Sequence, residues 1–104
     1  MTMAQIIRGT TPTIVYGFKD VTVADITAAY LTFERKGVVL LKLELTDATV
    51  GQTTIAWTLT QQQTLDITAG TTTVMCNWKL NDGTRGASPE TDIIFIDNHI
   101  PEVI

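Results

Sequence analysis

The chain has few of the residues from which reactive sites and metal sites are built. Its 104 residues include one cysteine, Cys76, one histidine, His99, and one serine, Ser88. A single cysteine excludes an internal disulfide and a cysteine metal cluster, and a single histidine excludes a site built from several histidines. A Ser–His–Asp site would need Ser88 beside His99. Cys76 alternates with apolar neighbours, so we expect it to be a core residue and not a reactive thiol.

Acidic residues near His99 do not predict a metal site either. Asp92, Asp97 and Glu102 match no structural zinc spacing, and a calcium loop needs denser acidic ligands around a glycine. We therefore expect no metal, no other cofactor and no enzymatic activity.

Charge and long apolar runs are also scarce. Seven Lys and Arg stand against eleven Asp and Glu, and charged residues make up only 17% of the chain. The net charge of −4 leaves no basic face for nucleic acid. Apolar runs fall short of the roughly 18 residues of a membrane span. The N-terminus lacks the basic start and apolar stretch of a signal peptide, so we expect no membrane contact and no export by that route.

The chain is rich in residues that form β-strands. Threonine occurs 20 times, and 44% of the residues are hydrophobic. Apolar and other side chains alternate with a period of two over residues 13–18, 26–35, 38–46, 55–59, 72–80 and 91–97. Lys36-Gly37 and Asn81-Asp82-Gly83 predict tight turns. The pattern predicts an all-β domain spanning residues 1–104, an antiparallel sandwich or barrel of six or seven strands.

One segment departs from the strand pattern. Thr60-Gln61-Gln62-Gln63 has the spacing of a capping box, in which the first hydroxyl binds the fourth amide and the fourth side chain reaches back. We predict one helical turn over residues 60–65, bridging two strands. Residues 21–25 are too short for a further element and predict a turn at a strand junction.

Hydrophobic residues are also found at both ends of the chain, where a small domain would have to shield them from water. We expect an N-terminal arm, residues 1–8, and a C-terminal tail, residues 98–104. Either these ends complete the core as an extra edge strand, or they reach onto a neighbouring subunit. The candidate interface residues lie in the arm, the second strand of the first hairpin, the final strand and the tail: Ile6, Ile7, Val38, Leu40, Ile93, Phe95, Ile100, Val103 and Ile104.

The two tryptophans allow two interpretations. Trp57 and Trp78 each lie in register with aliphatic residues, which favours packing in the core. If either is exposed, its indole can stack on a sugar, and the domain is then a carbohydrate-binding module for cell-wall sugars.

Several strings resemble one family. They are Arg-Gly-Thr-Thr-Pro-Thr-Ile at residues 8–14, Leu-Thr-Gln-Gln-Gln-Thr-Leu at 59–65, Asp-Gly at 82–83 and Ala-Ser at 87–88. Over residues 8–97 the chain resembles small β-sandwich proteins encoded among the tail genes of phages and prophages of Gram-positive bacteria. That group is similar to the immunoglobulin-like N-terminal domain of phage baseplate upper proteins.

The resemblance implies a fold and a role. The fold is an immunoglobulin-like antiparallel sandwich of about seven strands. The role is that of a non-enzymatic tail or baseplate component, or an assembly module. It would form a homo-oligomer, contact other phage structural proteins, and be found in the virion or in the bacterial cytoplasm before assembly.

Overall fold

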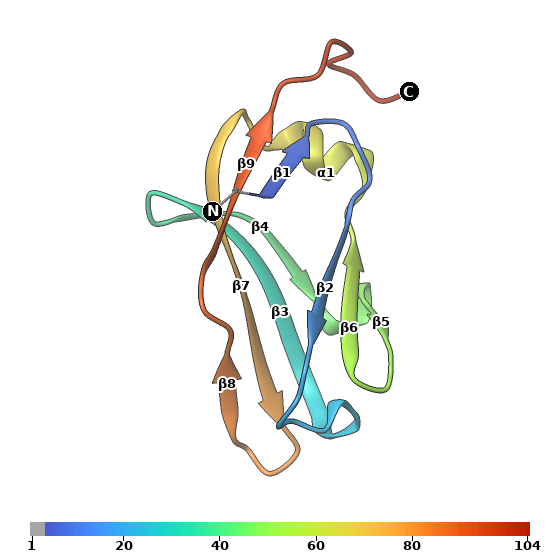
Figure 1. The fold of residues 1–104 in the computed structure, drawn as a ribbon, viewed down its shortest axis with the longest axis vertical. Coiled ribbons are helices and arrows are strands. Elements are labelled where there is room, and N and C mark those ends of the chain that lie inside the picture. Colours follow the sequence, from blue (N-terminus) through green and yellow to red (C-terminus); the bar gives the residue numbers. More distant parts are fainter. Residues whose placement is uncertain (1–3) are drawn as a thin grey trace.

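The computed structural model describes residues 4–104, and their strands form two sheets (Figure 1). In the larger sheet the strand order is β1-β9-β7-β3-β4, and β8 pairs with β7; in the smaller sheet it is β2-β6-β5. The strands are β1 (Ala4–Ile7), β2 (Thr13–Gly17), β3 (Ile26–Arg35), β4 (Val38–Glu44), β5 (Thr49–Val50), β6 (Thr54–Thr58), β7 (Gly70–Leu80), β8 (Arg85–Ala87) and β9 (Thr91–Ile96). One α-helix, α1 (Gln61–Asp66), and two 3-10 turns, η1 (Val23–Asp25) and η2 (Leu45–Asp47), complete the described residues.

The predicted all-β sandwich is confirmed, and the period-two alternation explains its core. On β3, Ala29, Leu31 and Phe33 are buried between the sheets, whereas the residues between them are partly exposed. The same alternation buries Ile55 and Trp57 on β6. Core contacts also join strands that are far apart in the sequence, such as the edge-on ring pair Phe33–Phe95, whose centroids lie 5.9 Å apart.

The N-terminal strand is the main departure from the predicted antiparallel arrangement. β1 pairs with β9 in parallel, with Ala4 opposite Ile93 and Ile7 opposite Ile96. The described part of the arm therefore forms an edge strand of the larger sheet. It also completes the core, because the Ile6 side chain is buried there. Met1 and Met3, which the sequence assigns to the same arm, lie outside the described residues.

Both predicted turns are present. Lys36 and Gly37 have φ angles of 53° and 80°, which suits a two-residue hairpin between β3 and β4. Residues 81–84 connect β7 to β8, a short strand that lies outside the predicted strand segments. β4 ends at Glu44, two residues earlier than predicted, because η2 then carries the chain to the smaller sheet.

The predicted helical turn is confirmed as α1, and its capping box is complete. The Gln63 amide donates to the Thr60 hydroxyl over 3.1 Å, and the Thr60 amide donates to Gln63 Oε1 over 2.8 Å. Thr64 ties this helix to the linker between β1 and β2, since its buried hydroxyl accepts from the Gly9 amide and donates to the Thr10 carbonyl. Within residues 4–104, no helix has the length and apolar character that crossing a membrane requires.

Candidate interaction surfaces

Three of the predicted interface residues lie in the core, so the prediction is wrong for them. Ile6, Ile93 and Phe95 are 5%, 6% and 1% exposed. The final strand is apolar on both faces, and its Ile93 and Phe95 face points between the sheets. These three side chains stabilise the fold and have no surface to offer to a partner.

The two predicted interface residues of the first hairpin are exposed. Val38 and Leu40 lie on β4 together with Val39, and the three side chains are 60%, 41% and 51% exposed. We call them the hairpin patch. They are exposed because β4 is an edge strand and the hairpin extends beyond the core at its Lys36-Gly37 tip. The pairing of β3 with β4 shifts between Phe33 and Glu34, so Leu40 is the extra residue of a β-bulge.

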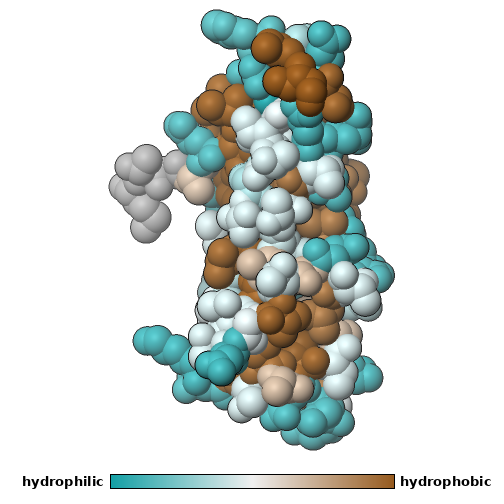
Figure 2. All heavy atoms as spheres, turned by 90° about the vertical axis from the view of Figure 1, so that its right-hand side faces the viewer, coloured by the Kyte–Doolittle hydropathy of each residue, from teal (hydrophilic) through white to brown (hydrophobic). Residues whose placement is uncertain are grey.

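A second group of exposed apolar side chains lies at the end of the molecule that carries the C-terminus. Figure 2 shows hydrophobic surface at this end and further hydrophobic surface lower on the side of the smaller sheet. Ile7 is 49% exposed and pairs in register with the partly exposed Ile96. The tail residues Ile100, Val103 and Ile104 are exposed, and the Ile104 amide donates to the Gln61 side chain on α1.

Trp57 cannot stack on a sugar. Its side chain is fully buried, packs edge-on against Tyr16, and donates its indole N–H to the Glu44 carbonyl over 2.9 Å. Trp78 is half-buried, lies edge-on to Phe18 at 5.1 Å, and is covered along one edge by Gly86.

The candidate nucleophiles have structural contacts. The Ser88 hydroxyl accepts from the Cys76 amide over 2.9 Å, while His99 lies in the exposed tail. Cys76 is buried, and burial raises the pKa of its thiol to about 11, so the thiolate does not form near neutral pH. Burial also raises the pKa of the Tyr16 phenol. Among residues 4–104, no cluster of three His, Cys, Asp or Glu side chains could hold a metal ion.

The outer face of the larger sheet contains a hollow that the sequence did not indicate. Strand pairing places Ala28 beside Lys79, and Lys79 beside Arg85. Tyr30 and Asn77 pair in the next row. Because Ala28 is small, it leaves a space of about 410 Å³ between the larger side chains. We call this space the cationic hollow; it is lined by Ala28, Tyr30, Asn77, Trp78, Lys79, Arg85 and Gly86.

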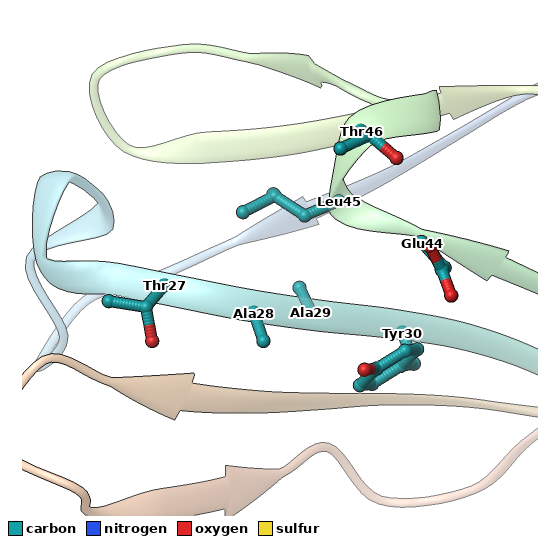
Figure 3. Close-up of a pocket in the computed structure, with 7 residues that line it drawn as sticks. All are labelled: Thr27, Ala28, Ala29, Tyr30, Glu44, Leu45 and Thr46. Carbon is teal, nitrogen blue, oxygen red and sulfur yellow. The ribbon is translucent and has the colours of Figure 1, made fainter.

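A smaller hollow of about 190 Å³ lies on the other side of Tyr30. Figure 3 shows Ala28 and Tyr30 projecting from one face of β3 and Ala29 from the other, with Glu44 and Leu45 arriving from the end of β4. β3 pairs with β4 only from Tyr30 onward, so the first residues of β3 line this hollow without a β4 neighbour. Figure 3 also shows that Glu44 and Tyr30 lie on the same side.

Arg8 and Arg35 join distant parts of the fold, whereas Arg85 at the cationic hollow donates only within its own turn, to the Gly83 carbonyl over 3.3 Å. Arg8 bridges to Asp97 over 2.9 Å, and Arg35 donates to Thr68 and Thr71. Lys42 instead stands 4.6 Å from the centroid of the Tyr30 ring, where ammonium and ring attract each other. Period-two alternation could have identified the outward row of β3 and β7, but only the strand pairing brings Arg85 beside Lys79.

Comparisons with known proteins support the fold. No protein-family model matches the chain, and no curated protein matches it. Among solved structures, it is similar to the immunoglobulin-like domain of mouse leukocyte-associated immunoglobulin-like receptor 1, crystallised as a strand-swapped dimer. The TM-score is 0.56 at 14% identity, over 90% of this chain and 88% of that one. The chain therefore has an immunoglobulin-like β-sandwich fold.

Proposed function

We propose that this chain is a non-enzymatic structural protein of a phage or prophage, a tail or baseplate component or an assembly module that acts through protein–protein contacts. The observation that carries the proposal is the exposure of clustered apolar side chains on so small a domain. The hairpin patch and the end of the molecule around Ile7 and the tail would both lose contact with water in an assembly.

Self-association is the simplest form of this assembly. The structural neighbour is itself a strand-swapped dimer, which is consistent with a sandwich of this kind forming oligomers. The short edge strand β1 and the edge strand β4 leave backbone groups at both margins of the larger sheet, and such margins favour pairing with another chain. A closed ring or a filament would follow from a repeated contact between copies.

Sedimentation velocity over a range of concentrations tests the proposal. We expect the wild-type protein to associate at high micromolar concentration, and Val39→Lys in the hairpin patch to weaken that association. Val15→Lys is the matched control, because Val15 is also an exposed valine, 58% exposed, on the outer face of the smaller sheet. A wild-type protein that stays monomeric would overturn self-association.

The phage assignment has its own test. We expect mass spectrometry of purified phage particles, induced from the bacterium that carries the gene, to detect this chain with the tail or baseplate proteins. A gene outside any phage cluster, together with absence from the particles, would refute the assignment.

Carbohydrate binding is the alternative function, and Trp78 is the tryptophan that could serve it. Most of this residue is covered, so a sugar would have to stack on the part that remains exposed. Titration with cell-wall polysaccharide should then change the Trp78 emission in a Trp57→Phe variant, and unchanged emission rejects the alternative.

A further inference from the structure

The cationic hollow has the chemistry of a site for a carboxylate carried by an apolar segment. Lys79 and Arg85 lie on adjacent strands and supply two positive charges at its rim, and the residues that line it include no carboxylate. Ala28 and the Tyr30 ring supply apolar surface at its floor and wall. A carboxylate between two cations gains charge-assisted hydrogen bonds, and its apolar neighbours gain burial.

The positive charges stand out against the composition of the chain. Lys79, Arg85 and the nearby Lys42 are three of the seven Lys and Arg residues in a protein of net charge −4. Glu44, the carboxylate that pairs in register with Tyr30, lines the smaller hollow and not this one. Because the chain as a whole is negatively charged, the positive hollow attracts a second copy.

The C-terminal tail carries the complementary chemistry. Glu102 is exposed and is followed by the exposed Val103 and Ile104. It is also the only acidic residue in positions 98–104. The tail and the cationic hollow lie toward opposite ends of a molecule that measures 46 Å along its longest axis, with the C-terminus at one end and β8 toward the other (Figure 1). A tail at one end cannot enter the hollow of its own chain.

We propose that the cationic hollow binds the tail of a second copy of this chain, with Glu102 between Lys79 and Arg85. This inference rests on the proposed function and specifies a contact between copies in addition to the hairpin patch. The contact is head-to-tail, so a pair of copies leaves one hollow and one tail free, each on a different copy. Such an interface builds a ring if the rotation closes and a filament if it does not.

Charge reversal tests the contact, with association measured by sedimentation velocity and folding checked by circular dichroism. Lys79→Glu/Arg85→Glu reverses the hollow, and Glu102→Lys reverses the tail. Each should weaken self-association at least tenfold, and the triple variant that combines them should regain it. Lys19→Glu/Lys36→Glu changes the net charge as much as the hollow reversal, at exposed positions elsewhere, and should associate like the wild type.

If net charge alone controlled self-association, the variants would associate in a different order of strength. Each substituted residue changes the net charge, which is −4 in the wild type, by two units. The hollow variant, with two substitutions, therefore carries −8, the tail variant −2 and the triple variant −6. Simple repulsion would make the triple variant associate less than the tail variant, whereas the proposal makes it associate more. If the wild type associates and the hollow variant associates as well as the lysine control, this inference fails and the proposed function stands. A monomeric wild type would refute this inference and self-association together, and would leave the phage assignment to its own test.

Discussion

Replacing Gly86 with alanine tests how closely β8 packs against the Trp78 ring. Gly86 lies on β8 opposite Trp78. A Cβ atom on Gly86 would lie 2.5 Å from Trp78 Cε2 and 2.6 Å from both Cζ2 and Nε1. Real Cβ atoms do not approach a ring so closely, so the indole has to move. Its edge-on contact with Phe18, at 5.1 Å, would be lost in that movement.

The size of the effect follows from two opposing contributions. Overpacking of this kind costs about 1–3 kcal/mol, and an aromatic pair contributes about 0.5–1.5 kcal/mol. Replacing glycine by alanine restricts the unfolded chain and returns about 0.4–1 kcal/mol. We therefore expect Gly86→Ala to lower the free energy of unfolding by about 2 kcal/mol, which corresponds to a decrease of roughly 1 M in the urea midpoint.

The assay is urea unfolding followed by circular dichroism, with Trp78 emission recorded in a Trp57→Phe background. Gly17→Ala is the matched control, because Gly17 also lies in a strand and a Cβ there meets no heavy atom of the described residues within 4 Å. In a Trp78→Leu background the cost of Gly86→Ala should fall below about 0.5 kcal/mol, since the clashing ring atoms are gone.

The reasoning is refuted if Gly86→Ala and Gly17→Ala unfold with free energies within about 0.5 kcal/mol of each other and the Trp78 emission does not change. The close approach of β8 to the indole would then impose no constraint on the residue at position 86.

Three further measurements address single contacts. Thr60→Ala should cost about 1 kcal/mol in urea unfolding because it removes the cap of α1, whereas the exposed Thr53→Ala should cost less than half of that. Trp57→Phe should cost about 2–4 kcal/mol, since it opens a cavity and leaves the Glu44 carbonyl without its 2.9 Å donor; an unchanged midpoint would contradict the burial of this ring. Cys76 should resist thiol reagents in the folded protein at pH 8 and react in urea. Because burial raises the pKa of the folded thiol from 9.0 to about 11, the unfolded state loses its proton first, and stability should fall as pH rises through that interval. In Cys76→Ala the fall should become smaller, leaving the part due to Tyr16, whose pKa burial also raises.

The burial of the candidate residues was only partly predictable from the sequence. Alternation places Ile93 and Phe95 on one face of a strand and Ile94 and Ile96 on the other, and it does not say which face meets the opposite sheet. The structure buries the first pair. Val38 and Leu40 are equally apolar, but they lie on an edge strand beyond the core, so their exposure depends on strand order.

The sequence by itself determined the local structure: period-two strands, the Lys36-Gly37 hairpin and the capped turn at Thr60. These depend on the conformational preferences and hydrogen bonds of residues that are close along the chain. Only the tertiary structure decided that β1 pairs in parallel with β9, that Trp57 is fully buried, and that Lys79 lies next to Arg85 and Ala28. Those outcomes depend on which strands become neighbours, and that choice is made by burying the whole core at once.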